Sequence, residues 1–595
     1  MPMPALFLVL ATLLPLAAFG LLLTIGKRMG DPLAGWVATA FAAGSFAFSM
    51  AGMIAWYEGG QLAGTTWGPG DKPIELTYKW LPLGPAISPD HPGFFDLNLH
   101  VDTLTVAMFN TITLVVALGH AFSARYMRND KRFARFFVYL QLSYFSMLAF
   151  VLGANLLEIL VFWYLIALSG YLLLTRLDDR PSGRFAIASF IVKRIGDAGF
   201  LVGMGILLHG LGNATVLQMD RWLWPATGAA IHLPSGAWIS GKTLSVVGIA
   251  LFCGAACRSA LFPLHFWLPA ARGAPIPAAA FVQSVTLTAA GLYLIGRFFP
   301  ILTPTAKLSI ATIGLLSLVV GALLALIQRD LGRVLAYSTV SQFGLMFMAI
   351  GIGSWVGGLF HLLTHAFFKS LLVLAAGSVI HAAHGEQDLN QFGGLMRKMP
   401  LAGVTFAIGL LAMAGAPFTC GYYSNQTILI HAGALASFHA MNQPLYRLFF
   451  IIPAAVSGLT ALYMTRCWML LFWGRPRNRQ LHVTARERTG FWFPLFGLAV
   501  VSLIGGSRLL DIKQSITQGM IETDNYCNSV RDPAAGQFAA FAPAWTNSAE
   551  QASNNTPSVE DSGERLFNRY ATWPFGVGIV LGFVFYCRRS PIKAT

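Results

Sequence analysis

The sequence has few charged residues, and its cysteines lack the spacing of a redox or metal site. Charged residues make up 11% of the 595 residues, against about 25% in ordinary soluble proteins, so a soluble globular protein is excluded. The six cysteines include no C-x-x-C pair, so no zinc site, iron–sulfur cluster or disulfide framework is indicated. No G-x-G-x-x-G dinucleotide-binding pattern occurs either, and we expect no Walker phosphate-binding loop. Any redox chemistry would therefore belong to partner chains.

Long apolar runs dominate what is present. Hydrophobic residues make up 55% of the chain and the mean hydropathy is +0.62. Runs of about 20 apolar residues can cross a bilayer as helices, which predicts an all-α polytopic membrane protein with about 15 spans. The predicted spans are Met3–Gly26, Leu33–Trp56, Val101–Ala121, Phe136–Val151, Leu156–Leu174, one from near Phe190, Val246–Cys257, Ala278–Phe298, Leu308–Ile327, Val334–Ile352, Trp355–Ile380, one from near Leu401, Leu448–Trp473, Phe491–Gly505 and Thr572–Cys587.

Between these spans, the net charge of +15 comes from short basic loops. This is the positive-inside pattern of a membrane protein, so the charge indicates topology and contact with the lipid bilayer, not nucleic-acid binding. It predicts an N-terminus outside the cell and a C-terminus in the cytoplasm. We expect residues 58–100 and 509–569 to be external loops, the second partly disordered.

The most informative stretch is Trp355–Ile380, which carries His361, His365 and Lys369 at i, i+4 and i+8. This spacing places all three on one helical face. Ionisable groups at membrane depth are costly unless they face a wet or paired interior, which favours a polar ion path. The alternative is two packed core histidines and a lysine that reaches an interface.

Prolines interrupt two spans. Pro263 and Pro269 follow Arg258 in span seven, and Pro417 and Gly421 lie in span twelve. Proline removes a backbone hydrogen bond and breaks a helix, and paired interruptions of this kind mark the transport path in repeat-built transporters. We therefore predict two structural repeats within four regions: 1–122, 123–300, 301–475 and 476–595.

Further ionisable residues lie within or beside the spans. Span six contains Arg194 and Asp197, Arg258 ends the apolar part of span seven, and His265 follows it. They are candidates for the same ion path. Alternatively, Arg194 and Asp197 pair within their helix, Arg258 pairs locally or reaches an interface, and His265 is a core histidine.

Several motifs together resemble a known family. They are Asp102, Arg135-Phe-Phe137, Arg194-Ile-Gly-Asp197, Ser259 to His265, Trp267-Leu-Pro269, Asp330 to Gln342, His361 to Lys369 and Glu386-Gln387. The chain is similar from about residue 100 to 505 to subunit L of bacterial respiratory complex I, the NADH-quinone oxidoreductase. That subunit is related to mitochondrial subunit five and to Mrp-type antiporter subunits. The resemblance implies two inverted five-helix repeats with helices seven and twelve broken.

The resemblance also implies a function. A chain of this family is a multi-pass subunit of the bacterial inner membrane that translocates protons coupled to electron transport to quinone. It works with other membrane subunits, while NADH, FMN, iron–sulfur clusters and quinone are held by partners and no cofactor by this chain. The implied proton path contains seven residues: His361, His365, Lys369, Arg258, Asp197, Arg194 and His265.

The chain departs from the family pattern at five relay positions. Arg258 replaces a lysine, and Tyr164, Gln283, Gly332 and Asn425 stand where a glutamate, a histidine, a basic residue and a lysine are expected. Arginine stays protonated in proteins, so Arg258 can hold charge but hardly relay a proton. The chain also stops at Thr595, without the family's long lateral helix. Two alternatives therefore stay open: a proton-channel subunit of an inorganic-carbon uptake or Mrp-type complex, and a non-conducting structural paralogue.

Overall fold

The computed structural model describes residues 1–62, 73–82, 94–174, 180–223, 231–232, 238–270, 274–438, 444–507, 513 and 559–587. These residues belong to two compact units. Unit 1 contains the described residues of Met1–Ser259 and Val285–Ser309 together with residue 513, and unit 2 contains those of Ala260–Ser284, Ile310–Ile512 and Pro533–Thr595. The predicted boundary between repeats at residue 300 stays a prediction.

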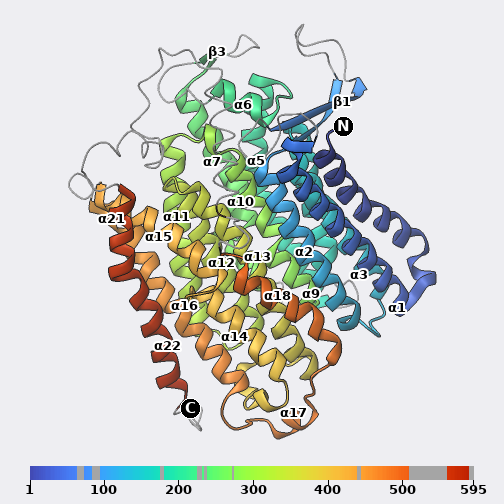
Figure 1. Cartoon of the computed structure of the whole chain (residues 1–595), viewed down its shortest axis with the longest axis vertical. Helices are drawn as coiled ribbons and strands as arrows, with labels where there is room; N and C mark the ends of the chain where they lie inside the picture. The colour runs from blue at the N-terminus through green and yellow to red at the C-terminus, as the bar shows by residue number, and fades with distance from the viewer. Residues whose placement is uncertain are drawn as a thin grey trace. The chain divides into compact units, whose positions relative to one another are not determined.

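Unit 1 is mainly helical. Its longest element, α1 (Met3–Leu62), leaves helical geometry at Gly30 and Asp31, so it provides the two predicted spans. The Ser45 hydroxyl donates to the Ala11 carbonyl at 2.6 Å, which shows that the two halves of α1 pack against each other. The other helices of the unit are α2 (Thr103–Tyr126), α3 (Phe133–Leu152), α4 (Leu156–Leu174), α5 (Arg180–Leu211), α6 (Val216–Leu223), α7 (Gly241–Arg258) and α10 (Leu287–Arg297) (Figure 1).

Unit 2 is built around α13 (Trp355–Ala382), whose apolar window is entirely buried. The helices α9 (Ile276–Ser284), α12 (Leu331–Gly351), α14 (Pro400–Ala414), α15 (Cys420–Phe438) and α18 (Trp492–Ile504) pack against it. Further elements are α8 (Trp267–Ala270), α16 (Leu448–Phe472), α17 (Arg479–Thr484), α21 (Val559–Leu566) and α22 (Thr572–Cys587). The helix α11 (Pro304–Ile327) begins in unit 1 and lies mostly in unit 2.

The predicted interruptions of spans seven and twelve are confirmed. The helix α7 ends at Arg258, and helical structure resumes only in the 3₁₀ turn Leu264–Phe266 and α8. In span twelve, α14 ends at Gly415, which adopts a positive φ of 79°, a conformation that glycine adopts without strain. A Cβ on Gly421 would approach the Ala412 carbonyl oxygen to 1.8 Å, so only glycine fits this close approach.

Span eight, predicted at Ala278–Phe298, is a candidate membrane span at Ile276–Arg297, but it contains a break that was not predicted. The helix α9 ends at Ser284 and α10 begins at Leu287. Thr286 between them has φ −113° and ψ −91°, outside the helical region. No proline or glycine lies between Gln283 and Thr288, so the sequence carries no breaker signal at this point.

Two predicted loops also contain regular structure. Within residues 58–100, β1 (Ile74–Pro82) pairs antiparallel with β2 (Phe94–Val101), and Ile74 lies opposite Val101. Outside these two loops, a second small sheet pairs β3 (Ile231–His232) with β4 (Trp238–Ile239). Residues 559–571 form α21 and one π-helical turn instead of loop, and the rest of the predicted disordered segment lies outside the described residues.

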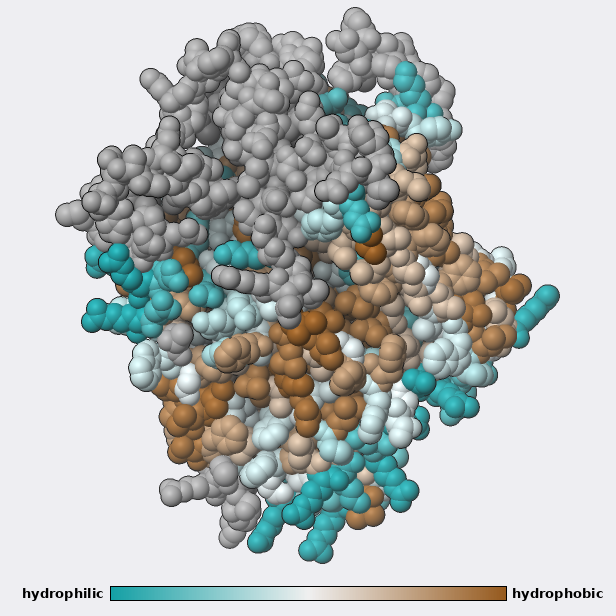
Figure 2. Space-filling view, viewed as in Figure 1, coloured by the Kyte–Doolittle hydropathy of each residue, from teal (hydrophilic) through white to brown (hydrophobic). Residues whose placement is uncertain are grey.

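The chain is a multi-pass membrane protein. Within the described residues, ten helices are long and apolar enough to cross a membrane, and two shorter apolar helices accompany them. The count of about 15 spans stays a prediction. In Figure 2, hydrophobic side chains gather over the middle of the helices of unit 2 and hydrophilic ones around α17.

Candidate functional site

The α13 face predicted to carry an ion path holds His361, His365 and Lys369, and all three side chains are fully buried. The ammonium of Lys369 donates to the Leu335 carbonyl at 2.5 Å and to the Ser338 hydroxyl at 2.7 Å. Both acceptors belong to α12. Because both acceptors are neutral oxygens, neither forms an ion pair that would stabilise the charged form of the amine, so this lysine can release its proton more easily than a paired one.

At the other end of this face, His361 bonds to two neighbouring helices. Its Nδ1 lies 2.9 Å from the Ser424 hydroxyl of α15, and its Nε2 lies 2.8 Å from Oε1 of Gln342 on α12. The Thr364 hydroxyl donates to Ser424 at 2.9 Å. These bonds fix the ring in orientation and connect it to polar groups on both sides.

His365 lies between the other two residues. Its ring centroid is 6.5 Å from that of His361, and the rings of Phe343 and Phe368 contact it edge-on at 5.3 Å. Neither of its ring nitrogens has a hydrogen-bond partner among the described residues. Buried polar groups are nearly always satisfied, so this ring either binds water or bonds to its neighbours in another conformation.

Two small hollows in unit 2 reach the residues that bond to this row. The first leaves about 30 Å³ for water and is lined by Leu335, which accepts from Lys369, together with Gln283, Gly332 and Gln387. The second leaves about 20 Å³ and is lined by Gln342, which bonds to His361, together with Asn425 and Thr460. A water needs about 10–15 Å³ of such space, so each hollow has room for at least one.

Unit 1 contains a second buried cluster with a different chemistry. Asp197 on α5 accepts a hydrogen bond from the Trp163 indole at 2.7 Å. Its Oδ2 lies 2.5 Å from Nη2 of Arg194, and its Oδ1 lies 3.6 Å from Nη2 of Arg258. The guanidinium of Arg258 is fully buried and sits 3.9 Å above the Trp163 ring. The structure therefore brings three predicted site residues together, in a network of fixed charges.

The five relay positions at which the chain departs from the family hold neutral or fixed groups. The Tyr164 ring lies 5.0 Å below the Arg194 guanidinium. Gln283 accepts from the Thr339 hydroxyl at 3.2 Å. Glu158 is the carboxylate on α4. It accepts hydrogen bonds from the backbone N–H groups of Asn98 at 2.6 Å and Ala154 at 3.0 Å, so it caps the start of α4 and connects it to β2.

His265 belongs to neither cluster. It lies in the 3₁₀ turn of unit 2, half-buried, with its ring centroid 5.9 Å from that of Phe262 and 6.2 Å from that of Tyr337. It makes no described contact with His361, His365 or Lys369. Its place in the predicted path stays a prediction.

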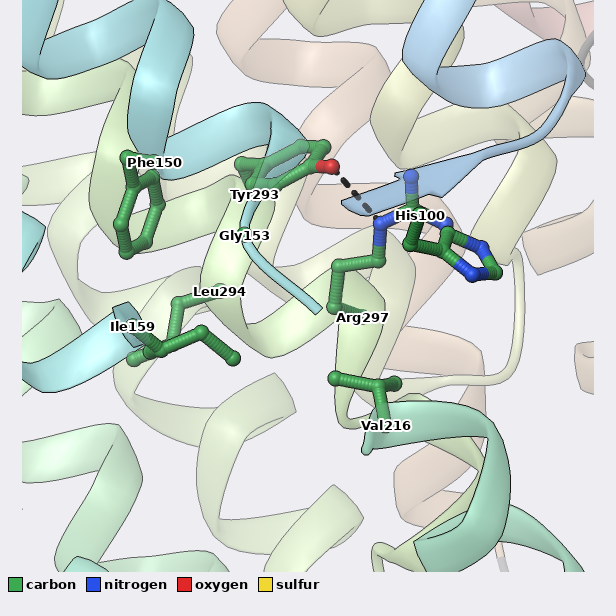
Figure 3. A pocket seen from close by; sticks show the side chains of 8 residues that line it. All are labelled: His100, Phe150, Gly153, Ile159, Val216, Tyr293, Leu294 and Arg297. Atoms are coloured by element: carbon green, nitrogen blue, oxygen red, sulfur yellow. Dashed lines mark hydrogen bonds between the residues drawn. The ribbon is translucent and has the colours of Figure 1, made fainter. Parts of the chain in front are cut away.

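A third polar cluster lies at the start of α2, where His100 and the N-cap residue Asp102 precede the helix. Arg297 of α10 forms a bidentate pair with Asp102. It also donates to the Tyr293 hydroxyl at 2.7 Å, and Figure 3 draws this bond. His100 lies 3.4 Å from Asp102 and 3.7 Å from Glu75. Burial would lower the pKa of His100, but the Asp102 and Glu75 carboxylates outweigh it and raise it to about 9. Burial would raise the pKa of Asp102, but Arg297 and His100 hold it well below its usual range.

The sequence reasoning missed the hydrogen-bond partners of the α13 row. Ser338 and Gln342 are four residues apart on α12, so they share one face and reach Lys369 and His361 respectively. Two polar side chains at this spacing within an apolar helix are the signal that could have found them. No cluster of three or more metal-ligating side chains occurs in the described part of the chain.

Residues 236–243 match the letters G-x-x-x-x-G-K-[ST] of a phosphate-binding loop, so the prediction that the sequence contains no such pattern is wrong. A phosphate-binding loop needs a strand before the loop and free backbone N–H groups within it. Here Trp238 and Ile239 already form β4, and the Ser240 hydroxyl caps α7 by accepting from the Thr243 N–H at 3.1 Å. The described part of this motif is therefore a strand and a helix cap.

Comparisons with known proteins agree with this architecture. The family described as NADH:quinone oxidoreductase/Mrp antiporter, TM, matches residues 153–443, and the family described as NADH-Ubiquinone oxidoreductase (complex I), chain 5 N-terminus, matches residues 93–137. NADH-quinone oxidoreductase subunit L of Pseudomonas aeruginosa is 38% identical over 422 residues, which are 70% of this chain and 65% of that protein. The chromatophore NAD(P)H-quinone oxidoreductase subunit 5 of Paulinella chromatophora is 38% identical over 67% of this chain and 59% of its own length.

A solved structure is also similar. A chain of the Mrp complex from Dietzia sp. aligns with a TM-score of 0.73 at 22% identity, covering 98% of this chain and 56% of that one. The fold, with its broken spans and its buried basic residues, defines an antiporter-like membrane subunit. The chain belongs to the family that includes complex I subunit L, chain 5 and the Mrp antiporter subunits. It aligns with less than two thirds of the length of these curated relatives.

Proposed function

We propose that this chain is a proton-translocating, antiporter-like subunit of a complex I-type NADH-quinone oxidoreductase, and that its conducting path lies in unit 2. Lys369, His365 and His361 carry the proton along α13. The observation that supports this most is the bonding of Lys369, whose amine is fully buried and, among the described residues, bonds only to the neutral oxygens of Leu335 and Ser338.

The neighbouring groups extend this row in both directions. The Lys369 acceptor Leu335 borders one hollow and the His361 partner Gln342 borders the other. Water in these hollows would deliver and remove protons, because a bridging water hydrogen-bonds nearly as well as a direct partner. In this proposal Arg258, Asp197 and Arg194 hold fixed charge in unit 1 and relay no proton, since arginine does not deprotonate.

We assign the chain to a membrane-bound assembly whose other subunits carry out the redox chemistry. The chain lies in a bacterial inner membrane with its N-terminus outside and its C-terminus in the cytoplasm, as the basic loops favour. Partner subunits hold NADH, FMN, iron–sulfur clusters and quinone, and this chain holds no cofactor. Purification in mild detergent should bring down further membrane subunits. A chain that runs alone and still transports protons contradicts assembly in a complex I-type enzyme.

The Lys369→Met variant tests the proton path. Methionine keeps most of the side-chain volume and removes the amine, so we expect at least about a 100-fold loss of proton flux, because a positioned proton-transfer group contributes about 10²–10⁴-fold. Flux would be measured as dye quenching in vesicles under an imposed potential, with unfolding temperature as a control for folding. Unchanged flux removes Lys369 from the path.

The second candidate is a structural paralogue that folds and docks but conducts nothing. The fixed charges of unit 1 favour it, because Arg258 and Tyr164 leave that unit without the lysine and glutamate that the family carries there. The same vesicle assay separates the two candidates. A paralogue gives no flux above that of empty vesicles in the unsubstituted protein.

A further inference from the structure

The buried cluster of unit 1 contains two permanently charged arginines, and only one described carboxylate neutralises them. The guanidiniums of Arg194 and Arg258 both depend on Asp197, and that carboxylate also accepts from the Trp163 indole. Among the described residues, no second carboxylate pairs with either arginine. Arginine keeps its charge in proteins, so at least one positive charge remains at membrane depth.

The buried guanidinium of Arg258 shows the deficit most clearly. Its Nε and both Nη atoms are buried, and none has a hydrogen-bond partner among the described residues. Its Cζ lies 3.9 Å from the centre of the Trp163 ring, and its Nη2 lies 3.6 Å from Oδ1 of Asp197. An uncompensated buried charge is expensive, so we expect a further anionic group near this cluster in the working assembly.

The cluster reaches the surface of unit 1 at one place. Arg194 is about a third exposed, at 29% of its side chain, and the neighbouring Tyr164 is half-buried. Around them α4 and α5 present exposed apolar side chains at helical spacing, which together with these two residues we call the α4–α5 face: Val161, Tyr164, Leu168, Ile187, Ile191, Arg194 and Ile195.

The depth of this opening decides between a lipid and a protein as the source of the anion. The Arg194 guanidinium lies 5.0 Å from the centre of the Tyr164 ring. Tyr164 is 8 residues after the first residue of the candidate membrane span α4 and 10 before its last, about 12 Å and 15 Å along the helix axis at 1.5 Å per residue. The hydrocarbon core is about 30 Å thick, so its middle is about 15 Å from either headgroup region. A lipid phosphate therefore lies too far away, whereas a carboxylate on a transmembrane helix reaches this depth.

We infer that the α4–α5 face docks a transmembrane helix of a partner subunit that carries an aspartate or glutamate at mid-membrane depth. The carboxylate pairs with Arg194. This contact frees Asp197 to bond more closely to Arg258, so one added charge satisfies both guanidiniums. The exposed leucine, isoleucine and valine side chains of the face pack against the apolar flanks of that helix. The inference does not depend on proton flux through unit 2.

Photo-cross-linking in the intact assembly tests this. A benzoylphenylalanine placed at Ile195 is activated in native membranes, and the adduct is sequenced. We expect a transmembrane peptide of another subunit with an aspartate or glutamate within one helical turn of the adduct. The matched control places the same probe at Val580 on α22, an equally exposed apolar site of unit 2, which should not capture that peptide.

A charge rescue then tests the pair itself. Neutralising the partner's carboxylate to its amide should lower the Ile195 cross-link at least about tenfold, because breaking a buried charge pair is strongly destabilising. Tyr164→Glu, which places a carboxylate beside Arg194, should restore most of the cross-link to the neutralised partner, whereas Tyr164→Phe should not. The unfolding temperature of each variant shows whether it folds.

Five results overturn the inference. They are no adduct at Ile195, an adduct with lipid only, an adduct with a helix that has no carboxylate at that depth, equal capture of the peptide from Val580, and less than a twofold effect of neutralising the partner. None of them bears on Lys369. The proposed proton path therefore stands or falls separately.

Discussion

Units 1 and 2 both bury basic side chains inside apolar helices, but they hold the charge in different ways. In unit 1, Asp197 pairs with the permanent cations Arg194 and Arg258. In unit 2, Lys369 is bonded to a carbonyl and a hydroxyl, and two histidines continue the row. A guanidinium keeps its proton, whereas a buried amine can release one. The comparison separates a site that stores charge from a site that can pass it on.

The largest expected effect concerns stability in unit 1. Asp197→Asn removes the one carboxylate that both arginines share, so the free energy of unfolding should fall by about 3–5 kcal/mol, the cost of breaking a buried charge pair. Chemical denaturation in detergent measures it. Asp130→Asn is the control, because Asp130 pairs with Arg132 in a partly exposed loop and should cost less than about 1 kcal/mol. Equal losses of unfolding free energy for the two substitutions would show that Asp197 stabilises the protein no more than a partly exposed ion pair does.

The next effect concerns transport through unit 2. His365→Phe keeps a ring between Phe343 and Phe368 but removes both nitrogens, so proton flux should fall about 100-fold, within the range for loss of a proton-transfer group. His431→Phe is the matched control. The Nε2 of His431 lies 3.3 Å from the Ile352 carbonyl, outside the row on α13, so this substitution should change flux less than twofold. Flux that survives His365→Phe would place the path elsewhere.

A smaller effect separates the units by pH. The pKa of His100 is raised to about 9 by Asp102 and Glu75 after burial is overcome. A raised pKa contributes stability that is complete below about 6.5 and is lost as pH rises through about 9. We expect unit 1 to lose about 2–3 kcal/mol between pH 6.5 and 9.5, at about 1.4 kcal/mol per pKa unit.

Hydrogen exchange by mass spectrometry measures this loss region by region. Exchange in α2, β1 and β2 should accelerate across that pH range after correction for intrinsic rates, while α12 and α13 should show no matching change. His100→Gln should remove the acceleration. The same acceleration in the His100→Gln variant would mean that another group titrates.

The sequence predicted the parts of this architecture that depend on backbone chemistry. Pro417 and Gly421 break span twelve because proline lacks a donor and glycine allows close approach. The row of His361, His365 and Lys369 was predicted from helical spacing alone, and the structure buries all three. The break at Thr286 could not be predicted, since no residue near it disfavours a helix strongly.

What the sequence could not supply is the identity of contacts between distant segments. Lys369 and its acceptor Leu335 are 34 residues apart, and a backbone carbonyl leaves no signal in the sequence. Asp197 and Arg258 were both candidates, but that Arg258 and Trp163 share the Asp197 carboxylate follows only from packing. The strands β1 and β2 were missed because their alternation lies in a segment rich in glycine and proline.

The most direct test exchanges the two kinds of cation in one assay. Proton flux would be measured in vesicles under an imposed potential for Lys369→Arg and for Arg258→Lys. The first places a permanent charge in unit 2 and should lower flux about 100-fold, whereas the second should change it less than twofold. Flux that survives Lys369→Arg, or that falls as far with Arg258→Lys, would contradict the division of the chain into a charge-storing and a proton-passing unit.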